Sequence, residues 1–428
     1  MLKNWCHALL GLAFFSSVEA LPAGVPLSVD GTNVVASANL ASSSMPSVFR
    51  GVNIGNWLVL EKWMDSTNLF SGAFSGAVDQ WTFDSIPGAQ EALELHWSTW
   101  FNETDVEKIA SWGFNALRIP IGYWAYSSKV QAPYLKGADA YLAKAIGWCR
   151  THGLKVLIDL HGVPGSQNGW DNSGHTGNVE WQSNNNMFHT TQALRQITRR
   201  YTNAENADVV FGIELVNEPI SWGNNNFQTT QSWTQRAFKA VQAVSKNSNL
   251  NVIMHDSFTG ANSWTGVGQN LNGNSALAQS RFWIDEHLYQ NQVAADSTLN
   301  QKQHIQKACG WASTELLPSS SNLPVIVGEF SAATNVCVNP DHTSTAGTSC
   351  TTTGCQCSAS TDMKEWKLPL KQATRRFFEA QVQTFEAHGR GWFIWAYKAP
   401  GAWGLTNLME YGILGSSVTD YKYPNICS

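Results

Sequence analysis

The feature that most constrains the fold of this sequence is a regular alternation of short apolar runs with stretches of helical periodicity. The apolar runs are Phe49–Ile54, Ala116–Ile119, Lys155–Leu160, Val209–Val216, Val252–His255, Phe282–Glu286, Val325–Gly328 and Trp392–Ala396. Helical patterns such as Asp139–His152 and Gln231–Ser245 lie between them. Continuous apolar strands separated by helices are typical of a parallel sheet that is covered on both faces. The alternation therefore predicts an α/β protein.

Eight such units favour a (β/α)8 TIM barrel. About 250 residues is typical for this barrel, and more than 400 occur with insertions, so the 428 residues fit. The alternative is an open, doubly wound sheet, but no glycine-rich phosphate loop follows the first run. No linker divides the chain, and we expect one catalytic domain over residues 48–428 with long loops. In the helical pattern Gln231–Ser245, the apolar stripe that includes Trp233 is expected to face the core.

The first twenty residues have the features of a secretory signal peptide. Lys3 supplies a positive charge, and the apolar run Ala8–Phe15 is shorter than the roughly 20 residues of a membrane span. Residues 21–47 are rich in Ser, Ala, Gly and Pro, which predicts a leader or propeptide. We therefore expect a secreted, extracellular protein without a membrane partner, in which Asn102 is a candidate N-glycosylation site.

The composition is rich in aromatic residues and poor in charge. The chain has 20 Trp, and 14% of its residues are charged, whereas about 25% is usual. There are 32 acidic and 27 basic residues, and no basic run stands out, which argues against a nucleic-acid partner. The tryptophans indicate either a Trp-rich core or surfaces that stack on flat apolar faces such as sugar rings, and composition does not choose between the two.

The cysteines favour an oxidising compartment. Cys149 shares a predicted helix face with Leu142 and Ile146, so we expect a buried free thiol. Six others remain after the signal peptide: Cys309, Cys337, Cys350, Cys355, Cys357 and Cys427. They allow three disulfides in fifteen pairings. Because no ligand set with zinc spacing accompanies Cys355-Gln356-Cys357, we expect a disulfide-stapled loop and no metal.

Polar and ionisable residues gather where the apolar runs end. They are Asn53, Glu61, Arg118, Asp159, His161, Asn217, Glu218, His255, Asp256, Asp285, Glu286, His287, Tyr289, Glu329 and Trp395. In a (β/α)8 barrel, the chemistry takes place at the C-terminal ends of the strands. Helix caps explain some of the Asp and Asn residues, but they do not explain His, Arg, Glu and Trp together.

Two carboxylates at these ends suggest a reaction. Glu218 follows the fourth run and Glu329 the seventh, so they lie on roughly opposite sides of a barrel mouth. Retaining glycosidases place two carboxyl groups about 5–5.5 Å apart, one as nucleophile and one as acid/base. We expect Arg118 to keep the nucleophile ionised, Tyr289 to hydrogen-bond to it, and Asn217 to bind the sugar 2-OH.

Three motifs resemble glycoside hydrolase family 5, in particular its fungal exo-1,3-β-glucanase branch. They are Arg50-Gly51-Val52-Asn53-Ile54-Gly55-Asn56-Trp57-Leu58-Val59-Leu60-Glu61, Arg118-Ile119-Pro120-Ile121-Gly122-Tyr123-Trp124, and the long stretch from Asp159 to Gly174. The resemblance runs from about Phe49 to the C-terminus. It implies a (β/α)8 barrel and a retaining mechanism without a cofactor.

The resemblance also implies roles for individual residues. Glu218 would be the acid/base and Glu329 the nucleophile. The shell around the reacting glucose would be Arg118, His161, Asn217, His287, Tyr289 and Trp395, with Glu61 and Asn172 at its hydroxyls. Cys309 and Cys427 match a family disulfide, and Cys337 would pair within the Cys-rich segment that follows it. We expect a monomer.

Departures from the family pattern concern the leaving group. The exo-glucanases are similar to one another in two Phe residues that clamp the departing sugar, where this chain has Trp170 and Gln292. Phe330 stands where a Trp usually follows the nucleophile, and Cys337–Cys357 looks longer than in typical members. In these features the chain also resembles the rutinosidase-type diglycosidases, which release 6-O-rhamnosyl-glucose from flavonoid glycosides. The expected substrate is therefore a flavonoid glycoside or, alternatively, a β-1,3-glucan.

A protein of another class would bind carbohydrate on this scaffold without turning it over. Aromatic shelves alone would permit such a protein. Retention of both Glu218 and Glu329 with their partners argues for catalysis.

Overall fold

The computed structural model describes residues 45–65, 67–127, 132–317 and 323–428. These described residues belong to one compact unit. The predicted signal peptide (1–20) and all but the last three residues of the predicted leader (21–47) lie outside the described residues. Within the described part, no helix is long and apolar enough to cross a membrane.

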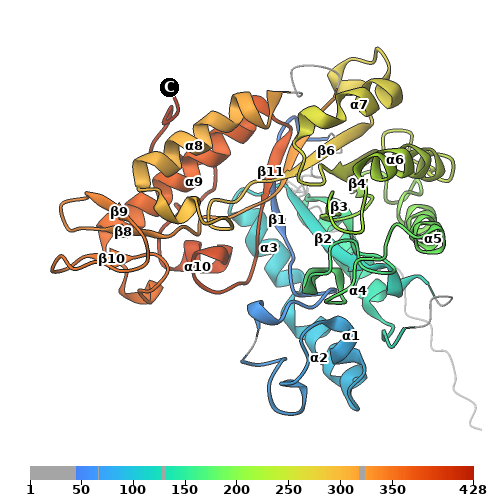
Figure 1. Ribbon diagram of the computed structural model, residues 1–428, viewed down its shortest axis with the longest axis horizontal. Coiled ribbons are helices and arrows are strands. Elements are labelled where there is room, and N and C mark those ends of the chain that lie inside the picture. Colours follow the sequence, from blue (N-terminus) through green and yellow to red (C-terminus); the bar gives the residue numbers. More distant parts are fainter. Residues whose placement is uncertain (1–44, 66, 128–131, 318–322) are drawn as a thin grey trace, which may run out of the picture. The chain divides into compact units, whose positions relative to one another are not determined.

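The unit is built on a closed barrel of eight parallel strands, as the alternation predicts (Figure 1). The strands are β1 (Phe49–Asn53), β2 (Ala116–Gly122), β3 (Lys155–Gly162), β4 (Val210–Glu214), β5 (Asn251–His255), β6 (Phe282–His287), β7 (Val325–Phe330) and β11 (Gly391–Ile394). They follow one another around the barrel in chain order, and β11 closes it against β1. Each of the eight apolar runs contributes one strand, so the prediction of a (β/α)8 barrel is confirmed.

The helices follow the strands along the chain. They are α1 (Gln80–Asp84), α2 (Ala89–Trp100), α3 (Glu103–Ser111), α4 (Ala138–His152), α5 (Asn184–Tyr201), α6 (Phe227–Gln242), α7 (Thr265–Asn272), α8 (Gln301–Thr314), α9 (Leu368–His388) and α10 (Leu405–Glu410). Side-chain caps from Asn102, Ser183, Asn226 and Asn300 start α3, α5, α6 and α8. Trp233 and Val241 on α6 are buried, whereas Val244 lies beyond the end of this helix and is only half-buried.

One end of the barrel is filled by apolar side chains. Each strand contributes one member to this layer: Phe49, Ala116, Leu157, Phe211, Ile253, Trp283, Ile326 and Phe393. Phe49 and Phe211 stack across it with ring centroids 4.0 Å apart. Because this layer plugs the N-terminal half of the strands, polar side chains can be held inside the barrel only toward the C-terminal ends.

The cysteines pair in three disulfides. Cys309–Cys427 links α8 to the C-terminal segment, as the family resemblance implies. Cys337 pairs with Cys357, and Cys350 pairs with Cys355. Cys149 is buried and free.

The Cys-rich segment forms a small sheet of its own between β7 and α9. Its strands are β8 (Val336–Val338), β9 (Ser344–Ala346) and β10 (Gln356–Cys357), in the antiparallel order β10-β8-β9. Figure 1 shows this sheet beside α8 and α9. Asn335, just before β8, donates a hydrogen bond to Ser297 of the β6–α8 loop (3.0 Å). The small sheet therefore supports a loop that leads to the barrel mouth.

Candidate active site

Arg118 is the centre of a buried polar network at the C-terminal end of the barrel. Its guanidinium is fully buried, and each of its five N–H groups has an acceptor within reach. The acceptors are Glu214 (2.7 Å from Nε), Asn53 and Glu329 (3.0 and 2.9 Å from Nη1), and Asn217 and Asp159 (2.7 and 3.2 Å from Nη2). This residue on β2 thereby fixes side chains from four other parts of the barrel wall.

The two glutamates meet at His287, which ends β6. His287 Nδ1 lies 2.8 Å from Glu218 Oε1 and 3.4 Å from Glu329 Oε2. The two carboxylate oxygens are therefore no farther apart than the sum of these distances. That limit is below the roughly 6.5–9.5 Å of inverting glycosidases and compatible with the roughly 5–5.5 Å of retaining ones. The geometry thus favours a retaining pair.

Each glutamate has a second set of partners. Glu329 also accepts a hydrogen bond from the Tyr289 hydroxyl (2.8 Å). Glu218 accepts one from Asn172 Nδ2 (2.7 Å) and has a positive φ of 45°. Such a backbone conformation is uncommon outside glycine and often occurs at functional sites. Both carboxylates are therefore held in fixed positions.

Gly328 makes room for the Asp285 side chain beside the strand that carries Glu329. A Cβ atom on Gly328 would lie within 1.8 Å of an Asp285 carboxylate oxygen. The Asp285 carboxylate instead accepts the Gly328 N–H. The residue before Glu329 therefore has to be a glycine for β6 and β7 to pack as they do.

Burial and charge shift the pKa values of the two glutamates in opposite directions. Burial raises the pKa of Glu329 to about 7, against the opposing effect of His287 and Arg118. For Glu218, the hydrogen bond and charge of His287 outweigh burial and lower the pKa. Burial lowers the pKa of His287, but the carboxylates of Glu329 and Asp285 outweigh burial and raise this pKa well above its usual value. This order is the reverse of that expected for an ionised nucleophile and a protonated acid.

The hydrogen bonds show how both roles remain available. His287 and Glu218 share one proton. It can lie on His287, which leaves Glu218 ionised, or on Glu218, which leaves His287 neutral. The two states differ only by transfer of this proton across the 2.8 Å hydrogen bond. The pair therefore holds one proton that either residue can carry. Glu329 accepts from Arg118 and Tyr289, and both donors favour its ionised form.

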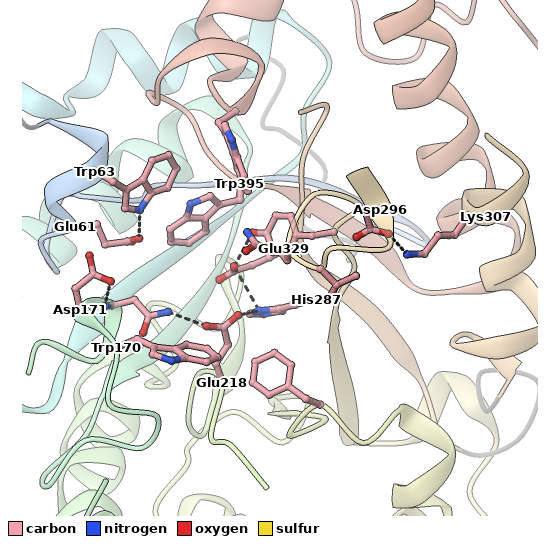
Figure 2. Close-up of a pocket in the computed structure, with 16 residues that line it drawn as sticks. Glu61, Trp63, Trp170, Asp171, Glu218, His287, Asp296, Lys307, Glu329 and Trp395 are labelled. Carbon is pink, nitrogen blue, oxygen red and sulfur yellow. Dashed lines mark hydrogen bonds and ion pairs between the residues drawn. The ribbon is translucent and has the colours of Figure 1, made fainter. Parts of the chain in front are cut away.

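Glu218 and Glu329 both line a cavity of about 640 Å³, whose lining side chains are drawn in Figure 2. Eight residues singled out from the sequence line it: Glu61, Trp170, Asn172, Glu218, His287, Tyr289, Glu329 and Trp395. The other three, Arg118, His161 and Asn217, are buried and do not line it. The His161 ring stacks parallel to Trp395 at 5.6 Å, so it supports the cavity wall instead of lining the cavity.

The cavity has two sides with different chemistry. Figure 2 shows Glu61, Trp63 and Asp171 on one side of Glu329, and Asp296 with Lys307 on the other. Burial and the nearby charge of Asp171 raise the pKa of Glu61 well above its usual value. A protonated Glu61 can both donate to and accept from sugar hydroxyls, while Trp63 Nε1 donates to it (2.9 Å).

Sequence reasoning did not single out several lining residues. They are Trp63, Asp171, Phe258, Val293, Asp296, Lys307 and Trp403. Gln292 also lines the cavity, where the family pattern has a phenylalanine. Phe258 could have been found, because it follows the strand-end pair His255-Asp256 by two residues. The side chains of Asp296 and Lys307, which form an ion pair, come together only through the packing of a loop against α8.

Two buried groups have oxygen and nitrogen atoms close enough to surround a cation: Glu218, His255 and His287, and Glu214, Asp285 and His287. His255 Nδ1 accepts the N–H of Ser257 (3.0 Å), so its Nε2 carries the proton and offers no lone pair. Glu214 is already paired with Arg118, whose charge disfavours a second cation. A third group consists of cysteines that are tied up in disulfides. These donor sets do not fit a resident metal.

Comparison with known proteins identifies relatives over almost the whole chain. The protein-family model of cellulase (glycosyl hydrolase family 5) matches residues 80–400. Probable glucan 1,3-beta-glucosidase A of Aspergillus niger is 35% identical over 404 residues, which cover 91% of this chain and 93% of that protein. Glucan 1,3-beta-glucosidase 1 of Schizosaccharomyces pombe is 35% identical over 390 residues, which cover 88% of this chain and 90% of that protein.

Solved structures share the fold. The crystal structure of rutinosidase from Aspergillus niger superposes with a TM-score of 0.67 at 22% identity, covering 86% of this chain and 97% of that one. The crystal structure of AoRut gives the same TM-score at 21% identity, covering 86% and 96%. At this level of identity the similarity concerns the barrel architecture.

Proposed function

Because this chain belongs to glycosyl hydrolase family 5, we propose that it hydrolyses a terminal β-D-glucosidic bond with retention of configuration, and that a β-1,3-glucan is its first candidate substrate. The observation that carries the proposal is the convergence of Glu218 and Glu329 on His287 across the barrel mouth. A protein that only binds carbohydrate needs neither this pair nor the donors that hold it.

The reaction has two steps. Glu329 attacks the anomeric carbon while Glu218 protonates the glycosidic oxygen, so that the bond to the leaving group breaks and a glycosyl-enzyme forms. Glu218, now ionised, then takes a proton from water as the water attacks the same carbon and releases Glu329. Two inversions leave the β configuration unchanged. No step requires a cofactor.

The remaining side chains have supporting roles in this proposal. Arg118 and Tyr289 stabilise the Glu329 carboxylate, and Asn217, held by Arg118, binds the sugar 2-OH. Trp395 forms the wall under the sugar ring, supported by His161. Glu61 and Asn172 bind other hydroxyls, and Asn172 also orients Glu218.

A second candidate is a rutinosidase-type reaction that releases 6-O-rhamnosyl-glucose from a flavonoid glycoside. Trp170 and Gln292 favour it because they depart from the exo-glucanase pattern, and the 640 Å³ cavity is large enough for more than one sugar ring. The sequence relatives named above are glucan 1,3-beta-glucosidases, so the rutinoside reading is not better supported than the glucan reading.

A product assay with laminarin and rutin side by side separates the candidates. Glucose released from laminarin supports the first, and intact rutinose released from rutin supports the second. Proton NMR of the first-formed sugar is expected to show the β anomer. The E329Q variant should lose turnover while its circular dichroism spectrum stays unchanged. Binding of both glycosides without any cleavage would refute catalysis.

We also propose that the protein is secreted as a monomer, with residues 1–20 removed. The signal-like N-terminus and three disulfides support this compartment. Asn102 is exposed, and its Oδ1 caps α3, which leaves Nδ2 for a glycan. Edman sequencing of the secreted protein should start near Leu21, and size-exclusion chromatography with light scattering should give one chain per particle.

A further inference from the structure

Exposed aromatic side chains are concentrated at one place on the described part of the chain. Five Phe and Trp side chains there are strongly exposed: Trp63 (38%), Trp170 (40%), Phe188 (57%), Trp222 (51%) and Phe258 (39%). Trp63, Trp170 and Phe258 line the cavity, whereas Phe188, on α5, does not. Trp222 does not line the cavity, yet it contacts a residue that does.

Trp170, Phe258 and Trp222 form a continuous aromatic face that leads out of the cavity. The Trp170 and Phe258 rings lie 5.7 Å apart, and the Phe258 and Trp222 rings lie 5.6 Å apart. Phe258 is therefore the middle of the face, with one tryptophan on each side. Exposed apolar surface of this kind, continuous with a binding cavity, typically marks further ligand contact.

The backbone holds this face in place. Ser257 and Phe258 both have positive φ angles, 63° and 59°, a conformation that is uncommon for residues other than glycine. Asp256 stabilises it by accepting the N–H groups of Phe258 (2.9 Å) and Gly260 (2.6 Å). Such a strained turn persists only where its surroundings determine it.

Trp222 is also presented by an ordered loop. Gln167, which precedes Trp170 by three residues, accepts hydrogen bonds from Ile220 N–H (3.2 Å) and Asn225 Nδ2 (2.8 Å) on the two sides of Trp222. The loops that carry Trp170 and Trp222 are thereby tied together. Little ordering of the protein remains to be done when a ligand stacks on them.

We propose that Trp222 forms a second leaving-group subsite, which stacks the ring one unit beyond the one that Trp170 and Phe258 contact. The inference rests on the proposed function. It adds that the enzyme prefers leaving groups of at least two rings with apolar faces, supplied either by a β-1,3-linked oligosaccharide or by a fused aromatic aglycone. Both present a flat apolar face to an indole ring.

The test compares substrates of different leaving-group length. Hydrolysis of laminaribiose gives a leaving group of one ring, whereas laminaritriose and laminaritetraose give two and three, and rutin provides a flavonol. In W222A, kcat/KM is expected to fall about tenfold more for laminaritriose than for laminaribiose. W222F, which keeps an aromatic ring, should retain most of the wild-type kcat/KM for laminaritriose. The matched control is F188A, which removes an exposed ring on α5. Its kcat/KM should equal that of the wild-type protein for all four substrates.

A larger loss in W222A for laminaritriose assigns the subsite to sugar rings, and a selective loss for rutin assigns it to a flat aglycone. An equal change for laminaribiose, laminaritriose and rutin would overturn the inference while leaving the proposed function intact. If the wild-type protein cleaves none of these glycosides, the proposed function fails. The affinity of E329Q and E329Q/W222A for laminaritriose, measured by calorimetry, then still decides whether Trp222 contacts the sugar.

Discussion

Arg118 Nη1 lies 2.9 Å from Glu329 Oε1, although the two residues are 211 positions apart in the chain. The same guanidinium pairs with Glu214 and Asp159, both fully buried. Burial raises the pKa values of these two carboxyl groups to about 8 and about 7, against the lowering effect of Arg118. The Arg118 guanidinium thus forms ion pairs with several buried carboxyl groups and fixes the position of Glu329, the proposed nucleophile.

Replacing Arg118 by lysine should therefore damage stability and activity together. A lysine keeps the charge but cannot supply five N–H groups in a fixed plane, so buried acceptors lose their partners. We expect R118K to lower the free energy of unfolding by about 3 kcal/mol and kcat/KM by about 10²–10³-fold. Urea unfolding and initial rates measure the two effects. R200K, which alters an exposed pair with Asp139, is the control and should change neither.

The two glutamates can be distinguished by azide rescue. In E218A, an activated substrate such as 2,4-dinitrophenyl β-glucoside still forms the glycosyl-enzyme, and azide then attacks it to give the β-glucosyl azide. In E329A, azide attacks the substrate directly from the nucleophile's side and gives the α-glucosyl azide. Without azide, E218A should lose about 10²–10⁴-fold in rate on an unactivated glucoside. Products of the opposite configuration, read by NMR, would mean that the roles are exchanged.

The hydroxyl of Tyr289 should set the acidic limb of the pH profile. It donates to Glu329 Oε2 (2.8 Å), and this hydrogen bond favours the ionised carboxylate, whereas burial raises the pKa of Glu329 to about 7. Removing the hydroxyl raises that pKa further. Since the proposed nucleophile must be ionised, the acidic limb of kcat/KM should move to higher pH in Y289F. The factor by which kcat/KM falls in Y289F is then larger at acidic than at alkaline pH.

Y141F is the matched control, because the Tyr141 hydroxyl makes only a long contact with Glu94 O (3.4 Å) on α2. Its pH profile should coincide with that of the wild-type protein. A uniform loss in Y289F at every pH would contradict the assignment and leave a purely structural role for this tyrosine.

The disulfides should contribute unequally to stability. Cys309–Cys427 closes a loop of 118 residues, whereas Cys350–Cys355 closes one of 5. By chain entropy alone, the first stabilises the fold by about 5 kcal/mol and the second by about 2 kcal/mol. We expect C309A/C427A to lower the free energy of urea unfolding by the larger amount and C350A/C355A by the smaller. Equal losses would show that local packing, and not loop length, determines how much each disulfide stabilises the fold.

Much of the barrel was predictable because its signals are local. A run such as Lys155–Leu160 is apolar because its strand is buried on both faces, and the structure extends it only to Gly162. At β4 the predicted run Val209–Val216 is trimmed to Val210–Glu214, because its last residues already turn into the loop that carries Glu218. Boundaries of this kind depend on pairing with neighbouring strands.

The aromatic residues show where local signals end. Composition left open whether the tryptophans fill a core or bind sugars. The structure separates them by position: Trp233 is buried on α6, whereas Trp170 and Trp395 line the cavity. Phe258 and Trp222 carry no periodicity and stand in loops, so nothing in their own neighbourhoods predicts that their rings meet.

By itself, the sequence determined the alternation of strands and helices, and with it the placement of Glu218 and Glu329 after the fourth and seventh strands. These features follow from hydrophobic periodicity, which is visible in short windows of residues, and from the order of the runs along the chain. Only the tertiary structure decided that five acceptors surround Arg118, that His287 joins the two glutamates, and that Trp170, Phe258 and Trp222 make one face. Those contacts join residues far apart in the chain, and they exist only once the barrel has closed and its loops have packed against one another.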